Sequence, residues 1–327
     1  MRSIVLPSWI ERGLGLAARP VPPHVFAVGR RELRYGAFLA APEGHLFQEF
    51  HSVPLPEEMF GSGPLGTPLA DPAQFEAALE RLQARISVPV KEASLVLPDS
   101  WARHLMVELG ELPQEPKAWQ EVLRFRLRRL LPFRVEELRV DVEPVASLVG
   151  QSEPGRSLVS FASEALCDAL EAGFARRGIR IGQIVGATLA TCAALARGGR
   201  TGALWGVTLV DAEGFALAIA SGAEPVLWRQ KSFTPGLADA DRARLLTAEL
   251  RLTRTFLSER LAAENLGAVF LAAPREVEPF WQGVLAAGLG CRPLRLGAEH
   301  LPLAGEVNLE AAAELAPLLG AACREVA

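Results

Sequence analysis

Gly61, Gly63 and Gly66 have the spacing G-x-G-x-x-G, in which glycine lets backbone N–H groups approach the pyrophosphate of a dinucleotide. A functional motif of this type follows a strand directly and opens a helix. Here the glycines lie in a Pro- and Gly-rich stretch, residues 53–70, and Pro64 among them lacks an N–H group. The spacing is therefore better explained by a surface loop than by a nucleotide site.

A second candidate is a cluster of arginines on or just after a segment, 119–131, whose apolar residues have helical spacing. The arginines are Arg124, Arg126, Arg128, Arg129 and Arg134. They suit an acidic partner segment or the anionic face of a membrane, whereas Glu121, Glu136 and Glu137 nearby favour a solvated helix face. We expect the solvated face, and no nucleic acid, because no aromatic platform for base stacking accompanies the arginines.

Metal and nucleophile chemistry is not indicated. The four cysteines are widely separated with no C-x-x-C pair, and the five histidines have no H-E-x-x-H spacing. We expect reduced, mostly buried thiols and no metal site. No Ser-His-Asp or Cys-His set can be assembled, so no catalytic residue is predicted.

Length and composition indicate a folded protein larger than one ordinary core. The chain has 327 residues, 50% of them hydrophobic and 22% charged, which predicts two lobes or several subdomains. The net charge of −4 gives no overall bias toward nucleic acid. The first residues lack a signal-peptide core and the apolar runs are too short for a membrane span, so a soluble cytoplasmic protein is expected.

Strands and helices alternate along the chain in two similar halves. A strand pair is predicted at 25–41, and three strands at 203–210, 215–220 and 225–233. Single strands are predicted at 93–97, 158–162, 179–184, 268–271 and 293–296. Helices are predicted at 71–86, which Asp71-Pro72 opens, and at 164–177, 188–196, 239–263, 277–287 and 309–324. The helix at 239–263 is expected to bury Leu245, Leu246, Leu250, Thr253, Phe256 and Leu257. The alternation predicts an α/β protein with two related lobes.

The stretch 97–145, LPDSWARHLMVELGELP…AWQEVLRFRLRRLLPFRVEELRVDVEPV, is the most specific part of the sequence. A strand and a turn lead into an amphipathic helix, which closes at Leu131-Pro132-Phe133 before another strand. This order resembles the signature of the type IV pilus assembly protein PilM family, and the elements over 158–196 follow the family's order as well. The closing helix is similar to the family's last pattern at Leu319, Gly320, Ala322 and Arg324.

The resemblance implies an actin-like (ribonuclease H-like) two-lobed α/β fold with a small FtsA-type inserted subdomain. It implies that residues 1–101 form the N-terminal part of the first lobe, 102–178 the inserted α/β subdomain, and 179–200 the return to the first lobe. Residues 201–308 would form the second lobe and 309–327 the closing helix. An actin-like fold normally binds ATP, so the residues that hold ATP decide the function.

The first phosphate loop of the family has the pattern D-x-G-x-x-x-x-K, in which glycine admits the phosphate and the lysine adds positive charge. In the matching run Gly29 is kept, the acid is Ala27 and the lysine is Arg34. The small residues between them are replaced by Arg30, Arg31 and Glu32. A carboxylate in this loop opposes a phosphate, so Gly29 is interpreted as a remnant of a cofactor-binding loop that has lost its function.

The other two nucleotide motifs depart from the family as well. The second phosphate loop aligns with 208–213, which starts at Thr208, has no glycine, and carries Asp211 and Glu213 where phosphate would lie. The glycine pair of the adenosine pocket is replaced by Ala272-Ala273, followed by Pro274-Arg275. We expect a pseudo-ATPase that is no enzyme and holds no cofactor. The alternative is an ATP-binding or ATP-hydrolysing actin/sugar-kinase-like protein that uses Mg²⁺ with atypical phosphate loops.

The resemblance also implies a partner. It predicts a scaffold of the type IV pilus, or of a related secretion system, that binds the N-terminal cytoplasmic segment of a single-span PilN-like inner-membrane protein. The segment would lie in a groove between the main lobe and the small subdomain. The protein would then be peripheral at the inner membrane, with pilus motor or platform proteins as further candidate partners. The candidate contact residues are Leu127, Arg128, Arg129, Leu130 and Phe133.

Overall fold

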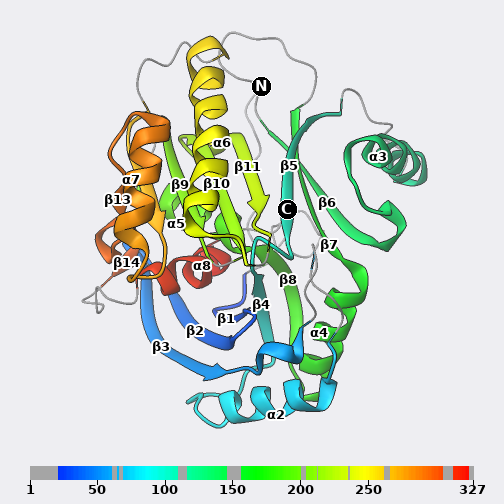
Figure 1. The fold of residues 1–327 in the computed structure, drawn as a ribbon. Helices are drawn as coiled ribbons and strands as arrows, with labels where there is room; N and C mark the ends of the chain where they lie inside the picture. The colour runs from blue at the N-terminus through cyan, green and yellow to red at the C-terminus, as the bar shows by residue number, and fades with distance from the viewer. Residues whose placement is uncertain are drawn as a thin grey trace, which may run out of the picture.

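The computed structural model describes residues 21–60, 65, 69–109, 116–145, 156–199, 204–211, 213–234, 236–260, 266–304 and 312–323. Within these residues the chain forms three β-sheets, which helices cover or separate (Figure 1). Two of the sheets repeat one topology, in which three antiparallel strands are followed by a parallel strand beside the first of them. The predicted α/β fold with two related lobes is confirmed.

The first sheet consists of β1 (His24–Val28), β2 (Glu32–Ala41), β3 (Gly44–Pro54), β4 (Glu92–Leu97), β8 (Arg180–Gly186) and β14 (Leu303–Ala304). Their order in the sheet is β14-β3-β2-β1-β4-β8. Side chains alternate between two cores, since Val25 of β1 joins one apolar cluster and its neighbour Phe26 joins the other. Helices α2 (Pro72–Gln83) and α4 (Glu164–Arg176) cover the Phe26 face, and α5 (Ala187–Arg197) and α8 (Ala312–Cys323) cover the Val25 face.

The second sheet consists of β9 (Leu204–Val210), β10 (Gly214–Ser221), β11 (Glu224–Ser232), β12 (Val269–Ala272) and β13 (Leu294–Arg295), in the order β11-β10-β9-β12-β13. Helices α6 (Asp239–Arg260) and α7 (Glu278–Leu289) pack on one face through a cluster that includes Leu250 and Trp281. The other face packs on the core that holds α5 and α8. These two helices therefore lie between the two large sheets.

Helices α5 and α8 approach each other closely at Gly320. A Cβ atom built on Gly320 would lie 1.7 Å from the carbonyl oxygen of Ala190 on α5, so only glycine permits this contact. The glycine in the closing helix of the sequence is therefore explained by helix packing. Nearby Pro317 lies within α8 and lines the cavity between the lobes.

The third sheet comes from the chain between β4 and β8, which are themselves parallel neighbours in the first sheet. It consists of β5 (Arg103–Glu108), β6 (Leu138–Pro144) and β7 (Arg156–Ser163), in the antiparallel order β5-β7-β6. Helix α3 (Pro116–Leu130) packs on the face of Val159 and Phe161, whereas Leu158 of β7 points into the main core. These elements and α4 fall within 102–178, and the predicted boundaries of that insert stay a prediction.

Three sequence-based expectations were wrong in detail. The stretch 53–70 is not simply a surface loop, because Leu55, Met59 and Phe60 are almost fully buried and pack under the first sheet. Proline and glycine interrupt the regular spacing of apolar residues in this stretch, yet individual apolar side chains still reach the core.

Leu245 of α6 is 51% exposed, since only its neighbour Leu246 lies on the buried face. Strands β3 and β14 were not predicted.

Candidate functional site

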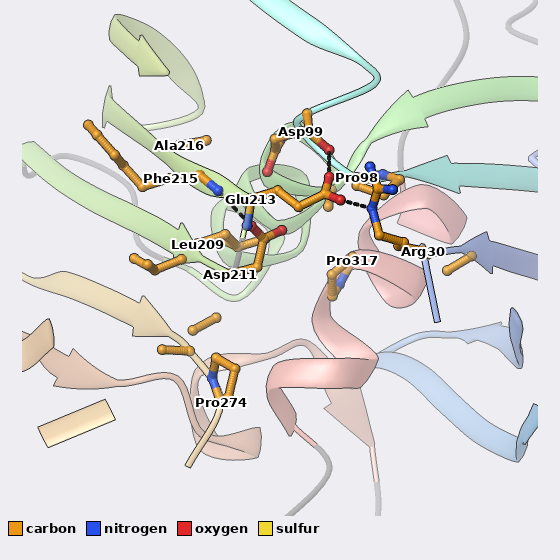
Figure 2. Close-up of a pocket in the computed structure, with 18 of the residues that line it drawn as sticks. Arg30, Pro98, Asp99, Leu209, Asp211, Glu213, Phe215, Ala216, Pro274 and Pro317 are labelled. Carbon is orange, nitrogen blue, oxygen red and sulfur yellow. Dashed lines mark hydrogen bonds and ion pairs between the residues drawn. The ribbon is translucent and has the colours of Figure 1, made fainter. Parts of the chain in front are cut away.

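A cavity of about 650 Å³ lies between the two large sheets, and it is lined by residues of both lobes (Figure 2). The three segments that the resemblance assigns to ATP meet there. Ala27 and Gly29 contribute from the end of β1, and Asp211 and Glu213 from the turn between β9 and β10. Ala272, Ala273, Pro274 and Arg275 contribute from the end of β12. The alignment of the three motifs in the sequence therefore leads to one place in the fold.

An ion pair crosses this cavity. The Nε–H group of Arg30, in the turn between β1 and β2, donates to Oε1 of Glu213. The other carboxylate oxygen of Glu213 accepts a 2.6 Å hydrogen bond from Oγ of Ser100, and Figure 2 shows the side chains of Arg30 and Glu213 pointing toward each other. Arg30 also donates to the carbonyl oxygen of Phe60 at 3.3 Å. Glu213 thus places a carboxylate in the cavity, on the segment that the resemblance aligns with the second phosphate loop.

Asp211 shapes the turn that carries Glu213. Its Oδ1 atom accepts the backbone N–H groups of Glu213 and Gly214, at 2.7 and 2.9 Å, as a side chain does in an Asx turn. Burial, followed by the nearby charge of Glu213, raises the pKa of Asp211 above its ordinary value. One oxygen of this carboxylate is therefore engaged by the turn that carries Glu213.

Asp99 lies at the carboxyl end of β4, in the Pro98-Asp99-Ser100 turn. It accepts hydrogen bonds from the backbone N–H and the hydroxyl of Thr188, at 3.1 and 2.6 Å, at the N-terminus of α5. Desolvation by burial raises the pKa of Asp99 to about 7, against the lowering effect of the two bonds from Thr188. Asp99 was not predicted as a site residue, although its position directly after a buried parallel strand is where ligands of α/β proteins bind.

Gln230 of β11 connects the cavity to the third sheet. Its Nε2 donates to the carbonyl oxygen of Asp99, and its Oε1 accepts the backbone N–H of His104 on β5 at 3.2 Å. His104 in turn bonds Oγ of Ser160 on β7 at 2.8 Å, and its ring packs 4.6 Å from that of Trp228. No sequence pattern signals this chain of contacts, because it joins four separate elements.

The remaining residues of the predicted phosphate loops have local roles. Thr208 is fully buried and donates to the carbonyl oxygen of Ala216, so it faces the core of the second sheet. Glu32, which the sequence placed against a phosphate, is paired with Arg34 and with the hydroxyl of Ser52. A Cβ atom on Gly29 would meet its nearest neighbour, the carbonyl oxygen of Glu32, at an ordinary 3.5 Å. Gly29 is therefore not required for packing.

A second, smaller cavity of about 80 Å³ lies between the third sheet and the first lobe. Its lining includes His104, Ser160, Arg139 and Asp141 from the sheet, and Gly186 at the end of β8. We call this place, between the third sheet and the first lobe, the interlobe groove; it is distinct from the larger cavity between the two large sheets. A Cβ atom on Gly186 would lie 2.3 Å from Nε2 of His104, so glycine allows the imidazole to sit directly against the first lobe.

The candidate partner residues lie on the other face of the third sheet. Leu127 is fully buried on the side of α3 that packs on the sheet, and Phe133 lies with its ring 6.1 Å from that of Phe161. Arg128 is ion-paired with Glu136. Arg129 and Leu130 are exposed, the latter by 51%. The structure therefore keeps these residues together on α3 and the turn after it, but separates them from the interlobe groove, and their role in binding stays a prediction.

Among the described residues, no group of three or more His, Cys, Asp or Glu side chains is arranged to hold a metal ion. Every helix in the described part of the chain is too short or too polar to cross a bilayer.

No protein-family model and no curated protein matches the sequence. A chain of the PilM–PilN type IV pilus biogenesis complex is 17% identical and has a TM-score of 0.72, over 93% of this chain and 98% of that chain. A Bacteroides thetaiotaomicron protein with an actin-like ATPase fold and unknown function is 10% identical, with a TM-score of 0.50 over 83% of this chain and 89% of that one. The chain therefore has the actin-like fold, and its resemblance to PilM is confirmed at the level of the fold.

Proposed function

We propose that this protein is a non-catalytic, actin-like scaffold of a type IV pilus or a related secretion machine. In that role it binds the N-terminal cytoplasmic segment of a single-span PilN-like protein and is held at the inner membrane through that partner. The observation that carries the proposal is the ion pair between Arg30 and Glu213, which lies in the cavity where the three aligned nucleotide motifs meet. The fold shared with PilM supports the choice of machine.

The electrostatics of the cavity support the loss of ATP. A triphosphate placed between the lobes would meet Glu213 and the nearby Asp211, and it would have to displace the ion pair with Arg30. Like charges placed close together repel, and the backbone N–H of Gly214 in the turn after β9 already donates to Asp211, so it does not face a phosphate. The site can hold the two lobes together without nucleotide, which is a structural rather than a catalytic role.

The interlobe groove is the better candidate for the partner segment. It combines a histidine, a serine hydroxyl and charged side chains with an apolar floor from Val185 and Leu189. An extended segment that buries apolar side chains while its backbone bonds to polar groups suits such a lining. Its contact with Gln230 through His104 also links it to the cavity between the lobes.

Binding of a synthetic peptide tests the proposal. The peptide carries the N-terminal cytoplasmic segment of a PilN-like protein, and fluorescence anisotropy measures its affinity. Asp141 is exposed and lines the groove, so Asp141→Arg should weaken binding about tenfold with little effect on folding. Ser160→Trp, which fills the groove, should abolish binding.

Arg124→Gln is the matched control, because Arg124 is exposed on α3, on the opposite face of the same sheet, and is not among the predicted contact residues. It should bind the peptide as the wild type does. If the wild-type protein fails to bind the peptide, or if a folded Ser160→Trp variant binds it normally, the proposed partner site is wrong.

One observation favours an ATP-dependent enzyme as the alternative: the cavity is large enough for a nucleotide, and Arg31, Arg275 and Arg295 line it beside the acids. Thermal unfolding with and without Mg-ATP separates the two functions. A ligand at 100 times its Kd stabilises the folded state by about 2.7 kcal/mol, whereas the scaffold should unfold at an unchanged temperature.

A further inference from the structure

Helix α3 has an outward face that combines positive charge with exposed apolar side chains. From Val122 to Leu130 the sequence contains four arginines and no acidic residue. Phe125 is 56% exposed and Leu130 is 51% exposed, whereas Leu123 and Leu127 on the opposite side of the helix are buried in the subdomain core. The inward leucines already hold the helix on the sheet, so folding does not explain the outward Phe125.

Arg129 and Phe125 form a unit on this face. They are one helical turn apart, and the guanidinium carbon of Arg129 lies 4.8 Å from the centre of the Phe125 ring. Arg124 is exposed beside them. Arg128 is ion-paired with Glu136, and Glu121 lies one turn before Phe125, so part of the positive charge is balanced. We call Arg124, Phe125, Arg129 and Leu130 the α3 ridge.

We propose that the α3 ridge binds the surface of an anionic lipid bilayer directly. Arginine guanidinium groups would donate to lipid phosphates, while Phe125 and Leu130 would enter the boundary between headgroups and acyl chains. The net charge of the protein is −4, so a positive ridge also gives it a preferred orientation at a negative surface.

The shape of the ridge favours a membrane over an acidic peptide. Helix α3 lies at the outer edge of the molecule, beyond β6, as Figure 1 shows. None of its residues that the structure describes lines either of the two cavities described above. A peptide binds more tightly when it lies in a groove. A flat bilayer needs no groove, and an outward helix that carries both charge and an aromatic ring can bind it.

Helix α6 shows that exposed leucine alone does not make such a surface. It has the exposed Leu245 and Leu252, but its arginines alternate with Asp239, Asp241, Glu249 and Glu259. This helix therefore provides matched control positions. The proposal goes beyond the scaffold function, since contact with lipid through α3 needs no partner in the interlobe groove.

Vesicle flotation of the purified full chain tests the proposal without any partner protein. The probes are phosphatidylcholine vesicles with and without phosphatidylglycerol. Binding is expected only to the anionic vesicles, and it should weaken as salt is raised. Each arginine at an anionic surface strengthens binding roughly fivefold, so Arg124→Gln/Arg129→Gln should bind roughly 25-fold more weakly. Phe125→Ala should also lose binding, at low and at high salt.

Controls come from the exposed residues of α6. Arg251→Gln/Arg254→Gln and Leu252→Ala should bind the vesicles as the wild type does. The proposal is overturned if the wild type does not bind anionic vesicles, if it binds neutral vesicles equally, or if the α6 variants lose as much binding as the α3 variants. Retention of the protein on immobilised polyglutamate without vesicle binding would instead assign the ridge to an acidic protein. Because the vesicles hold no protein, failure here leaves the peptide-binding result unaffected.

Discussion

Arg30 and Glu213 are 183 residues apart in the sequence, yet their side chains form an ion pair that joins the first turn of one lobe to the first turn of the other. The two turns occupy equivalent places in the repeated topology, after β1 and after β9. In an actin-like protein that uses ATP, a phosphate would lie between such turns and join them. Here the protein supplies both the anion and the cation itself.

This ion pair should contribute measurably to stability. The two side chains are 27% and 23% exposed, so solvent screens the pair only in part. A double-mutant cycle with Arg30→Gln and Glu213→Gln should give a coupling energy of about 1 kcal/mol in urea unfolding, and less in 1 M salt. Additive effects of the two substitutions would show that the lobes are held by other contacts.

The free energy of unfolding should decrease as the pH rises, because of Asp99. The carboxyl group has a pKa of about 7 in the folded protein and an ordinary value of 3.8, so the folded state binds more protons between these values. An acid whose pKa is raised on folding contributes a penalty that grows as pH rises through this window. From pH 5 to pH 8 the free energy of unfolding of the wild type should fall by on the order of 2 kcal/mol relative to that of Asp99→Asn.

The difference in free energy of unfolding between the wild type and Asp99→Asn removes the effect of other titrating groups, since Asp211 and the buried thiols titrate in both proteins. Asparagine can still accept the N–H of Thr188. Unfolding by urea at several pH values measures the difference, and parallel pH profiles for the two proteins would contradict the assignment.

Two glycine substitutions should have opposite effects. Gly320→Ala places a methyl group 1.7 Å from the backbone oxygen of Ala190 and should destabilise the fold by about 3 kcal/mol, because α5 and α8 would have to separate. Gly283→Ala, on the exposed side of α7 with no atom within 4 Å of the added group, should stabilise it by up to about 1 kcal/mol. Thermal unfolding of both variants checks this, and equal effects would show that the close approach is not rigid.

Much of the fold could be predicted because local signals agree with tertiary packing. Asp71 and Pro72 predict the start of a helix, and Asp71 indeed accepts the N–H groups of Ala73 and Gln74 at the start of α2. The strand triplet from β9 to β11 follows from its apolar runs. Strand β3 was missed because it alternates poorly, with most of its side chains only half buried, and its pairing with β2 fixes it instead.

The candidate site could be predicted only in part. The motif positions Ala27, Asp211 and Ala272 were expected at one place and do line one cavity. The partner of each charge was not predictable, because it depends on distances between elements far apart in the chain. Glu32 was expected to repel phosphate, but it pairs with Arg34 on its own strand, and Glu213 provides the carboxylate in the cavity. Sequence spacing can locate a loop, but the side chains that face the loop are known only from the fold.

Calorimetric titration of the wild-type protein with Mg-ATP tests the central claim most directly, namely that Glu213 and Arg30 fill the place of the phosphates. The measurement uses a preparation that binds the partner peptide, so the protein is known to be folded. The ion pair predicts no saturable heat up to about 1 mM nucleotide. A Kd of about 10 µM or tighter, lost when Mg²⁺ is chelated, would contradict it and make the protein an ATP-binding member of the actin-like fold.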